Sequence, residues 1–192
     1  MTPRLLGSCL LAACLVTSCG GDPPNKEMDQ AQGAIDAARA AGADRYATTE
    51  FTAATDALKR AQDAVGQRDY RQALQEALDS REHAQNAARE AADSKAQLRA
   101  EVERDMAQIA ALIAEANTRL AAASRSRLPR RTLDGSRKTL AAVDDSVQKA
   151  GAAMKADDYL SAKADLQGVR EQITQATTAL EGPGAQSSRR SR

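Results

Sequence analysis

A run of about 58 residues without glycine or proline, from Asp69 to Ser126, limits the fold of this chain most strongly. Apolar residues recur along it at the three-, four- and seven-residue spacing of one helix face. They are Ala73, Ala77, Ala84, Ala88, Ala91, Leu98, Val102, Ile109, Ile113, Ala116 and Leu120. At about 1.5 Å per residue, one helix over this run would be about 85 Å long. We therefore expect a central helix along which other helices pack.

Shorter periodic segments flank this run and predict further helices. They start near Glu27, near Thr48, between Pro129 and Leu133, and at Tyr159, and the last continues to Leu180. Breaks are expected at Gly42 to Thr48, Gly66–Arg68, Leu128–Pro129 and Ala156–Asp157. The pattern predicts an all-α fold. We expect an elongated antiparallel helical bundle whose long central helix, at about 69–126, is shared by two helical-hairpin repeats.

The composition agrees with an all-helical chain. Among its 192 residues there are one phenylalanine, three tyrosines and no tryptophan. Alanine, which is abundant here, favours helices over strands. Small side chains cannot fill a broad globular interior, but they fit the narrow space between closely approaching helices.

The N-terminus has the features of a bacterial lipoprotein signal. One basic residue, Arg4, precedes an apolar stretch that is too short to cross a bilayer. The stretch ends in Val16-Thr17-Ser18-Cys19, which resembles a lipobox, in which small residues precede a cysteine that receives a diacylglyceryl group. Leu11-Ala12-Ala13-Cys14 is a rival cleavage site, but cleavage there would leave a very short apolar core. We predict cleavage before Cys19 and lipidation of its thiol.

Several expectations follow from cleavage before Cys19. Gly20 would be the second residue of the mature chain, which by resemblance to enterobacterial sorting rules favours the outer membrane, facing the periplasm. Residues 1–18 carry one charged side chain, Arg4, so the mature chain would have equal numbers of basic and acidic residues. Nucleic acid is therefore not an expected partner. Of the three cysteines only Cys19 would remain, so we expect no disulfide.

A shift of 89 positions relates two segments of the chain. It places Asp69-Tyr70-Arg71-Gln72-Ala73 on Asp158-Tyr159-Leu160-Ser161-Ala162, each just after a helix break. We interpret the pattern as one hairpin used twice, with structural roles for Asp69, Tyr70, Ala73, Asp158, Tyr159 and Ala162. In each copy the aspartate would cap a helix, the tyrosine would cover the turn, and the alanine would let two helices approach.

These features resemble a bacterial lipoprotein family known as domain of unknown function 4398. Arg45 to Ala77 carries the first copy of its pattern, with a tyrosine-containing break and the Asp-Tyr-x-x-Ala hairpin. A second copy, Leu128 to Ala162, lacks the tyrosine at the break. The resemblance implies alanine-rich helices and no established activity. We therefore expect a signal peptide at 1–18, a lipidated linker at 19–26, helical repeats at 27–93 and 94–181, and a disordered Ser/Arg-rich tail at 182–192.

Residues suited to catalysis or metal binding are scarce. His83 is the one histidine and has no second His, Cys or paired carboxylate at ligand spacing, so we interpret it as a solvent-facing helix residue. There is no phosphate-binding loop and no nucleophile motif. We expect neither an enzyme nor a bound cofactor or metal.

One charged segment stands out as a candidate binding surface. Locally, Asp134 is the one acidic residue among six cations: Arg125, Arg127, Arg130, Arg131, Arg137 and Lys138. Cations suit a helix C-terminus, but Arg130 and Arg131 begin a helix, where the helix dipole disfavours them. The leading hypothesis for the chain is a structural or scaffolding lipoprotein held in the membrane by the lipid on Cys19. The alternatives are a binding module for peptidoglycan or an acidic envelope protein, and a regulator of an envelope enzyme; the oligomeric state stays open.

Overall fold

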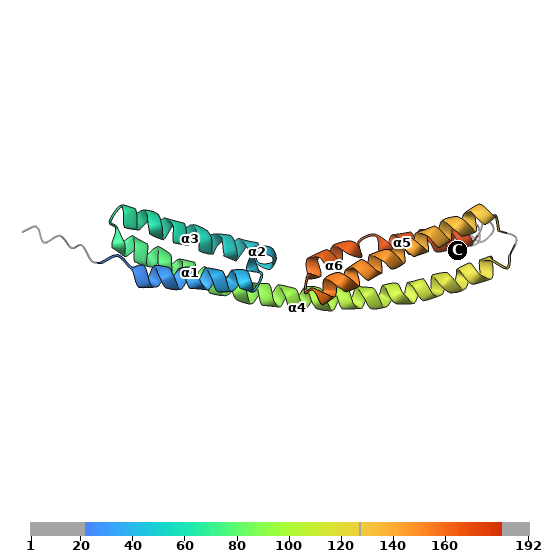
Figure 1. Cartoon of the computed structure of the whole chain (residues 1–192), viewed down its shortest axis with the longest axis horizontal. Coiled ribbons are helices and arrows are strands. Elements are labelled where there is room, and N and C mark those ends of the chain that lie inside the picture. The colour runs from blue at the N-terminus through green and yellow to red at the C-terminus, as the bar shows by residue number, and fades with distance from the viewer. Residues whose placement is uncertain (1–21, 127, 182–192) are drawn as a thin grey trace, which may run out of the picture. The chain divides into compact units, whose positions relative to one another are not determined.

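The computed structural model describes residues 22–126 and 128–181, and all its regular elements are helices (Figure 1). They are α1 (Asn25–Ala40), α2 (Ala43–Tyr46), α3 (Thr48–Gly66), α4 (Tyr70–Ala123), α5 (Arg130–Lys155), α6 (Tyr159–Asp165) and α7 (Val169–Leu180). Helix α4 contains 54 residues. The prediction of an all-α, antiparallel fold with a long central helix is confirmed.

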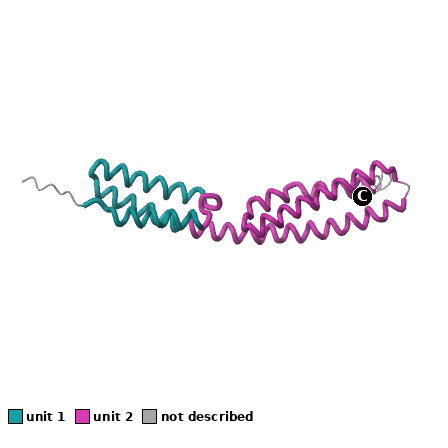
Figure 2. Tube along the Cα trace, viewed as in Figure 1, with its two compact units in different colours: residues 1–40, 48–87 teal, residues 41–47, 88–192 magenta. Residues whose placement is uncertain are grey.

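The chain divides into two compact units that share α4 (Figure 2). The described part of unit 1 comprises residues 22–40 and 48–87. Unit 2 comprises residues 41–47 and the described residues from 88 onwards. The short helix α2 therefore belongs to unit 2, although α1 and α3 on either side of it belong to unit 1.

Unit 1 packs α1, α3 and the first part of α4 around a core made mostly of alanine. Its buried alanine and larger aliphatic side chains are Ala31, Ile35, Ala38, Ala54, Ala57, Leu58, Ala61, Ala64, Ala73, Ala77, Ala84 and Ala87. The buried Ser80 hydroxyl of α4 donates a 2.8 Å hydrogen bond to the Ala54 carbonyl of α3. Because alanine removes little area from water, this unit gains less hydrophobic stabilisation per residue than a core of larger side chains.

Unit 2 packs the second part of α4 against α5, α6 and α7, and its core contains larger side chains. The cluster comprises Val102, Ile109, Ala116, Leu140, Val143, Ala150, Ala162, Leu166, Val169, Ile173 and Ala176. Cross-helix ion pairs join α4 to the opposite helices, with Glu101 bound to Lys163 of α6 and Asp105 bound to Arg170 of α7. Periodic apolar residues thus face inward, while the charged residues that separate them lie outside.

Two details differ from the expected order of helices. The break before Thr48 contains a helical turn, α2, which begins after Gly42 in the left-handed conformation at φ 86°. The segment from Tyr159 to Leu180 is not one helix, and the prediction that it would be continuous is wrong. It ends at Asp165 and resumes at Val169, because Gly168 adopts φ 77°, which ends an α-helix.

Candidate functional site

Two residues that the sequence analysis singled out, one for lipidation and one for binding, are not among the described residues. Cys19 lies outside the described residues, and so does Arg127. Lipidation of Cys19 therefore stays a prediction.

The remaining basic residues lie where α4 ends and α5 begins. Arg125 is in the turn after α4, and Arg130 and Arg131 are the first two residues of α5. The side chains of Arg125, Arg130, Arg131 and Lys138 are all exposed, and we refer to these four residues as the cationic patch. Among the described residues, no ion pair or side-chain hydrogen bond involves any of the four.

Arg137 differs from the cationic patch because it has partners. Its guanidinium lies 2.9 Å from the Asp134 carboxylate and 3.4 Å from the Ser124 hydroxyl of the preceding turn. The one acidic residue of this segment is therefore already paired.

The N-terminus of α5 has no acidic or capping side chain. Pro129 is the N-cap of α5 and provides no side-chain acceptor, and the first turn of α5 contains no acidic residue.

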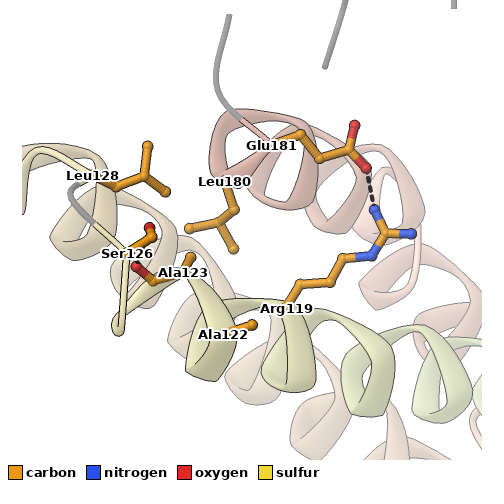
Figure 3. Close-up of a pocket in the computed structure, with 7 residues that line it drawn as sticks. All are labelled: Arg119, Ala122, Ala123, Ser126, Leu128, Leu180 and Glu181. Carbon is orange, nitrogen blue, oxygen red and sulfur yellow. Dashed lines mark hydrogen bonds and ion pairs between the residues drawn. The ribbon is translucent and has the colours of Figure 1, made fainter. Parts of the chain in front are cut away.

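An open groove of about 450 Å³ lies at the C-terminal ends of α4 and α7 (Figure 3). It is lined by Arg119, Ala122, Ala123, Ser126, Leu128, Leu180 and Glu181. Figure 3 shows an ion pair between Arg119 and Glu181 on the side opposite Leu128. Leu180, Ala123 and Leu133 form a small buried cluster here, so the base of the groove is apolar.

The predicted hairpin residues lie at two turns with the same backbone path. Arg68 and Asp157, the 89-residue equivalents, are non-glycine residues at φ 60° and 56°. The amide of Asp69 donates to the Ala64 carbonyl over 2.9 Å, and the amide of Asp158 donates to the Ala153 carbonyl over 3.0 Å. Both aspartates accept a hydrogen bond from a backbone amide of the following helix, those of Gln72 and Ser161. Ala73 and Ala162 are both fully buried.

The two tyrosines of these turns have different surroundings. Tyr70 is half-buried, and among the described residues its hydroxyl forms no hydrogen bond. Tyr159 is only 7% exposed, and its hydroxyl donates a 2.6 Å hydrogen bond to the Asp157 carboxylate. That hydrogen bond is the main reason that the pKa of Tyr159 is raised.

Two residues that the sequence analysis gave no role bind the second turn. The Tyr46 hydroxyl accepts a hydrogen bond from the Tyr159 amide over 3.1 Å and donates to the Asp157 carbonyl over 3.4 Å. Arg45 lies 2.7 Å from the Asp158 carboxylate. We call these two residues the Arg45–Tyr46 clasp. The one signal in the sequence was the tyrosine in the break before Thr48, which did not indicate its distant partner.

Local contacts hold the clasp in place, and the clasp lowers the pKa of Asp158. Lys95 lies over the Tyr46 ring, 5.2 Å from its centroid. A Cβ atom on Gly42 would be 2.9 Å from the Lys95 Nζ atom, so glycine also leaves room for this lysine. The hydrogen bond from Arg45, followed by those from Ser161, lowers the pKa of Asp158, because each stabilises the carboxylate.

His83 reaches solvent, as expected of a helix surface residue, but it also has a partner on another helix. Its side chain is 40% exposed, and its Nδ1 atom lies 2.8 Å from a Glu50 carboxylate oxygen of α3. The pairing crosses between α4 and α3, which sequence neighbours could not indicate. Within residues 22–126 and 128–181, no three His, Cys, Asp or Glu side chains form a group suited to a metal ion. None of the described helices is both long and apolar enough to span a bilayer.

In residues 22–126 and 128–181 every regular element is a helix, and a turn with an Asp-Tyr pair occurs twice. Residues 26–103 match the model of the family described as Domain of unknown function (DUF4398), and this range is a DUF4398 domain. The matched range contains α1, α2, α3 and the first part of α4, and it ends before α5 begins. Comparisons with curated proteins and with solved structures found no match.

Proposed function

We propose that this chain is a lipid-anchored scaffold of the bacterial cell envelope. The observation that supports it best is the order of the segments. A lipobox at Val16-Thr17-Ser18-Cys19 precedes α1 by a short linker, and the two helical units that follow share α4. A lipid on Cys19 would hold the first helix close to a membrane surface. The outer membrane, with the helices in the periplasm, is the proposed location because Gly20 follows Cys19.

Helix α4 suits a scaffold because it belongs to both units. Its 54 residues have a contour length of about 80 Å, at about 1.5 Å per residue. Ser80 is the one polar side chain that is buried among the described residues of unit 1, so its charged side chains lie at least partly on the outside.

Membrane fractionation and intact-mass measurement test the anchor. The chain expressed in its bacterial host should separate with the outer membrane and have a mass that corresponds to a chain starting at Cys19 with acyl chains attached. A Cys19→Ser variant should lose the membrane association. An unmodified soluble chain, or a chain starting at Cys14, would contradict this part of the proposal.

Crosslinking in cells tests the scaffold role. A photoreactive residue would replace an exposed lysine in each unit, Lys59 in unit 1 and Lys149 in unit 2. A scaffold should crosslink to envelope components from both units. Crosslinks from both positions to one envelope enzyme alone, with a changed activity of that enzyme, would favour a regulator and contradict the scaffold.

A further inference from the structure

We propose that the cationic patch binds the carboxylate-bearing peptides of the cell wall. This inference rests on the proposed function, since it assumes that the chain lies in the envelope. The patch consists of Arg125, Arg130, Arg131 and Lys138, and it is formed by described residues of unit 2 alone.

The patch gathers four cations that form no ion pair with any described residue, whereas many cations elsewhere in the described chain are paired. Arg45, Arg60, Lys163 and Arg170 each reach an acidic side chain on another helix or turn. Arg39, Arg99 and Arg119 each pair with an acidic side chain three or four positions away on their own helix. Other described cations, such as Lys59, Arg71 and Lys149, also form no ion pair, so the patch is set apart by having four such cations within residues 125–138. They leave a net positive surface, because Arg137 already neutralises Asp134.

The position of these cations does not serve the stability of α5. The partial positive charge of a helix N-terminus disfavours Arg130 and Arg131, and Pro129 provides no side-chain cap. Residues that break a local rule without a structural gain are candidates for function. Attraction of an anionic partner is the role that four unpaired cations can fill.

The arrangement along α5 favours a polymer over a single small anion. Arg131 and Lys138 are seven residues apart and Arg130 and Lys138 are eight apart, so they lie on the same side of α5. At about 1.5 Å per residue, the row is about 12 Å long. It can therefore contact several carboxylates at once, and guanidinium groups bind carboxylates through paired hydrogen bonds.

The surroundings of the patch favour the cell wall over a lipid surface. Proteins that lie on membranes usually combine cations with apolar side chains that enter the interface. Among the described residues, the exposed large hydrophobic side chains are Leu74 and Leu160, and neither belongs to the patch. Leu128 and Leu180 line the adjoining groove, but Leu128 is partly buried and Leu180 is buried. Peptide stems of the cell wall offer carboxylates without requiring an apolar contact.

Cosedimentation of the full-length lipidated chain with purified cell-wall sacculi tests the proposal. The variant replaces Arg125, Arg130, Arg131 and Lys138 with glutamine. The matched control replaces four cations that have acidic partners with glutamine, which changes the net charge by the same amount. These are Arg39, Arg60, Arg99 and Lys163. Circular dichroism should show the same helix content for all three chains.

The patch variant should be retained about tenfold less than the original chain at low salt, while the control stays within about twofold. Raising the salt, or converting the carboxylates of the sacculi to amides, should release the original chain, because exposed charges are screened beyond about 8–10 Å. Equal retention of variant and original, equal loss in variant and control, or no retention at low salt would overturn the proposal. Tighter binding to vesicles with anionic phospholipid than to sacculi would assign the patch to a lipid surface instead.

Failure of this proposal can be distinguished from failure of the proposed function. Fractionation of the same variants reports the anchor independently of the patch. A chain that remains in the outer membrane but does not bind sacculi leaves the scaffold standing and removes the wall contact. A chain that binds sacculi in vitro but is not lipidated in cells leaves the wall contact standing and removes the lipid-anchored scaffold.

Discussion

The turn before α4 and the turn before α6 have the same backbone path but are covered differently. Both contain a left-handed residue followed by an aspartate that accepts a hydrogen bond from the next helix. Within the part of the chain that the structure describes, only the second turn has a phenol from another segment, that of Tyr46, bound to the first amide of the helix. Local sequence therefore suffices to form the turn, whereas the burial of its tyrosine depends on a distant segment.

The cores of the two units differ in a related way. Unit 1 is lined mostly by alanine, and the largest of its fully buried side chains is Ile35. Unit 2 buries Ile109, Ile173, Val102, Val143 and Val169 just as completely. The clasped turn thus belongs to the unit with the larger apolar side chains, where removal of a buried ring should cost more.

The largest effect that we predict is on truncation of the second tyrosine. Tyr159→Ala should lower the melting temperature of the chain by about 5–15 °C, because it removes a buried ring and its hydrogen bond to Asp157. Tyr70→Ala, the equivalent change, should lower the free energy of unfolding by no more than about 1 kcal/mol, since that ring is only half-buried. Thermal unfolding followed by circular dichroism measures both. Equal losses would mean that the two turns are equivalent after all.

A smaller effect is expected from removal of the clasp hydroxyl alone. Tyr46→Phe leaves the ring beneath Lys95 but removes the group that binds the Tyr159 amide and the Asp157 carbonyl. The free energy of unfolding should fall by about 1–2 kcal/mol, because two hydrogen bonds are lost and each typically contributes about 0.5–1.5 kcal/mol. Tyr70→Phe is the control, and chemical denaturation should place it within about 0.5 kcal/mol of the original chain. A neutral Tyr46→Phe variant would show that the clasp contributes no stability.

The smallest effect depends on pH. The pKa of Asp158 is lowered in the folded chain, chiefly by Arg45, so its carboxylate contributes stability above the unfolded pKa of about 3.9. That contribution is lost as the pH falls through the lower folded value. The difference in melting temperature between the original chain and Arg45→Gln should therefore be largest at neutral pH and shrink below about pH 4. A difference that grows on acidification would contradict the assigned pairing.

Periodicity, breaks and the internal repeat were enough to predict α1, α3, α4 and α5, but not α2 or the division between α6 and α7. The run from Asp69 to Ser126 predicted α4 to within a few residues, because no glycine or proline interrupts its apolar face. The 89-residue shift identified two turns whose backbone hydrogen bonds correspond closely. Gly168 was not recognised as a break, because the apolar spacing continues through it in sequence while the backbone does not.

The missed contacts all join residues far apart in sequence. Tyr46 and Tyr159 are separated by 113 positions, and the pairing of His83 with Glu50 crosses between two helices. Neither contact follows from a residue's own neighbours, since each depends on which faces of the helices meet. The cationic patch could be predicted more fully, because a run of like charges at a helix start is itself a sequence signal.

Amide hydrogen exchange at the two tyrosines tests the central comparison most directly. The Tyr159 amide donates to Tyr46, whereas among the described residues the Tyr70 amide, also at the start of a helix, has no acceptor. The Tyr159 amide should exchange slowly in the original chain and rapidly in Tyr46→Phe, while the Tyr70 amide should exchange rapidly in both. Equal exchange at the two amides in the original chain, or protection of the Tyr159 amide that survives Tyr46→Phe, would contradict the account.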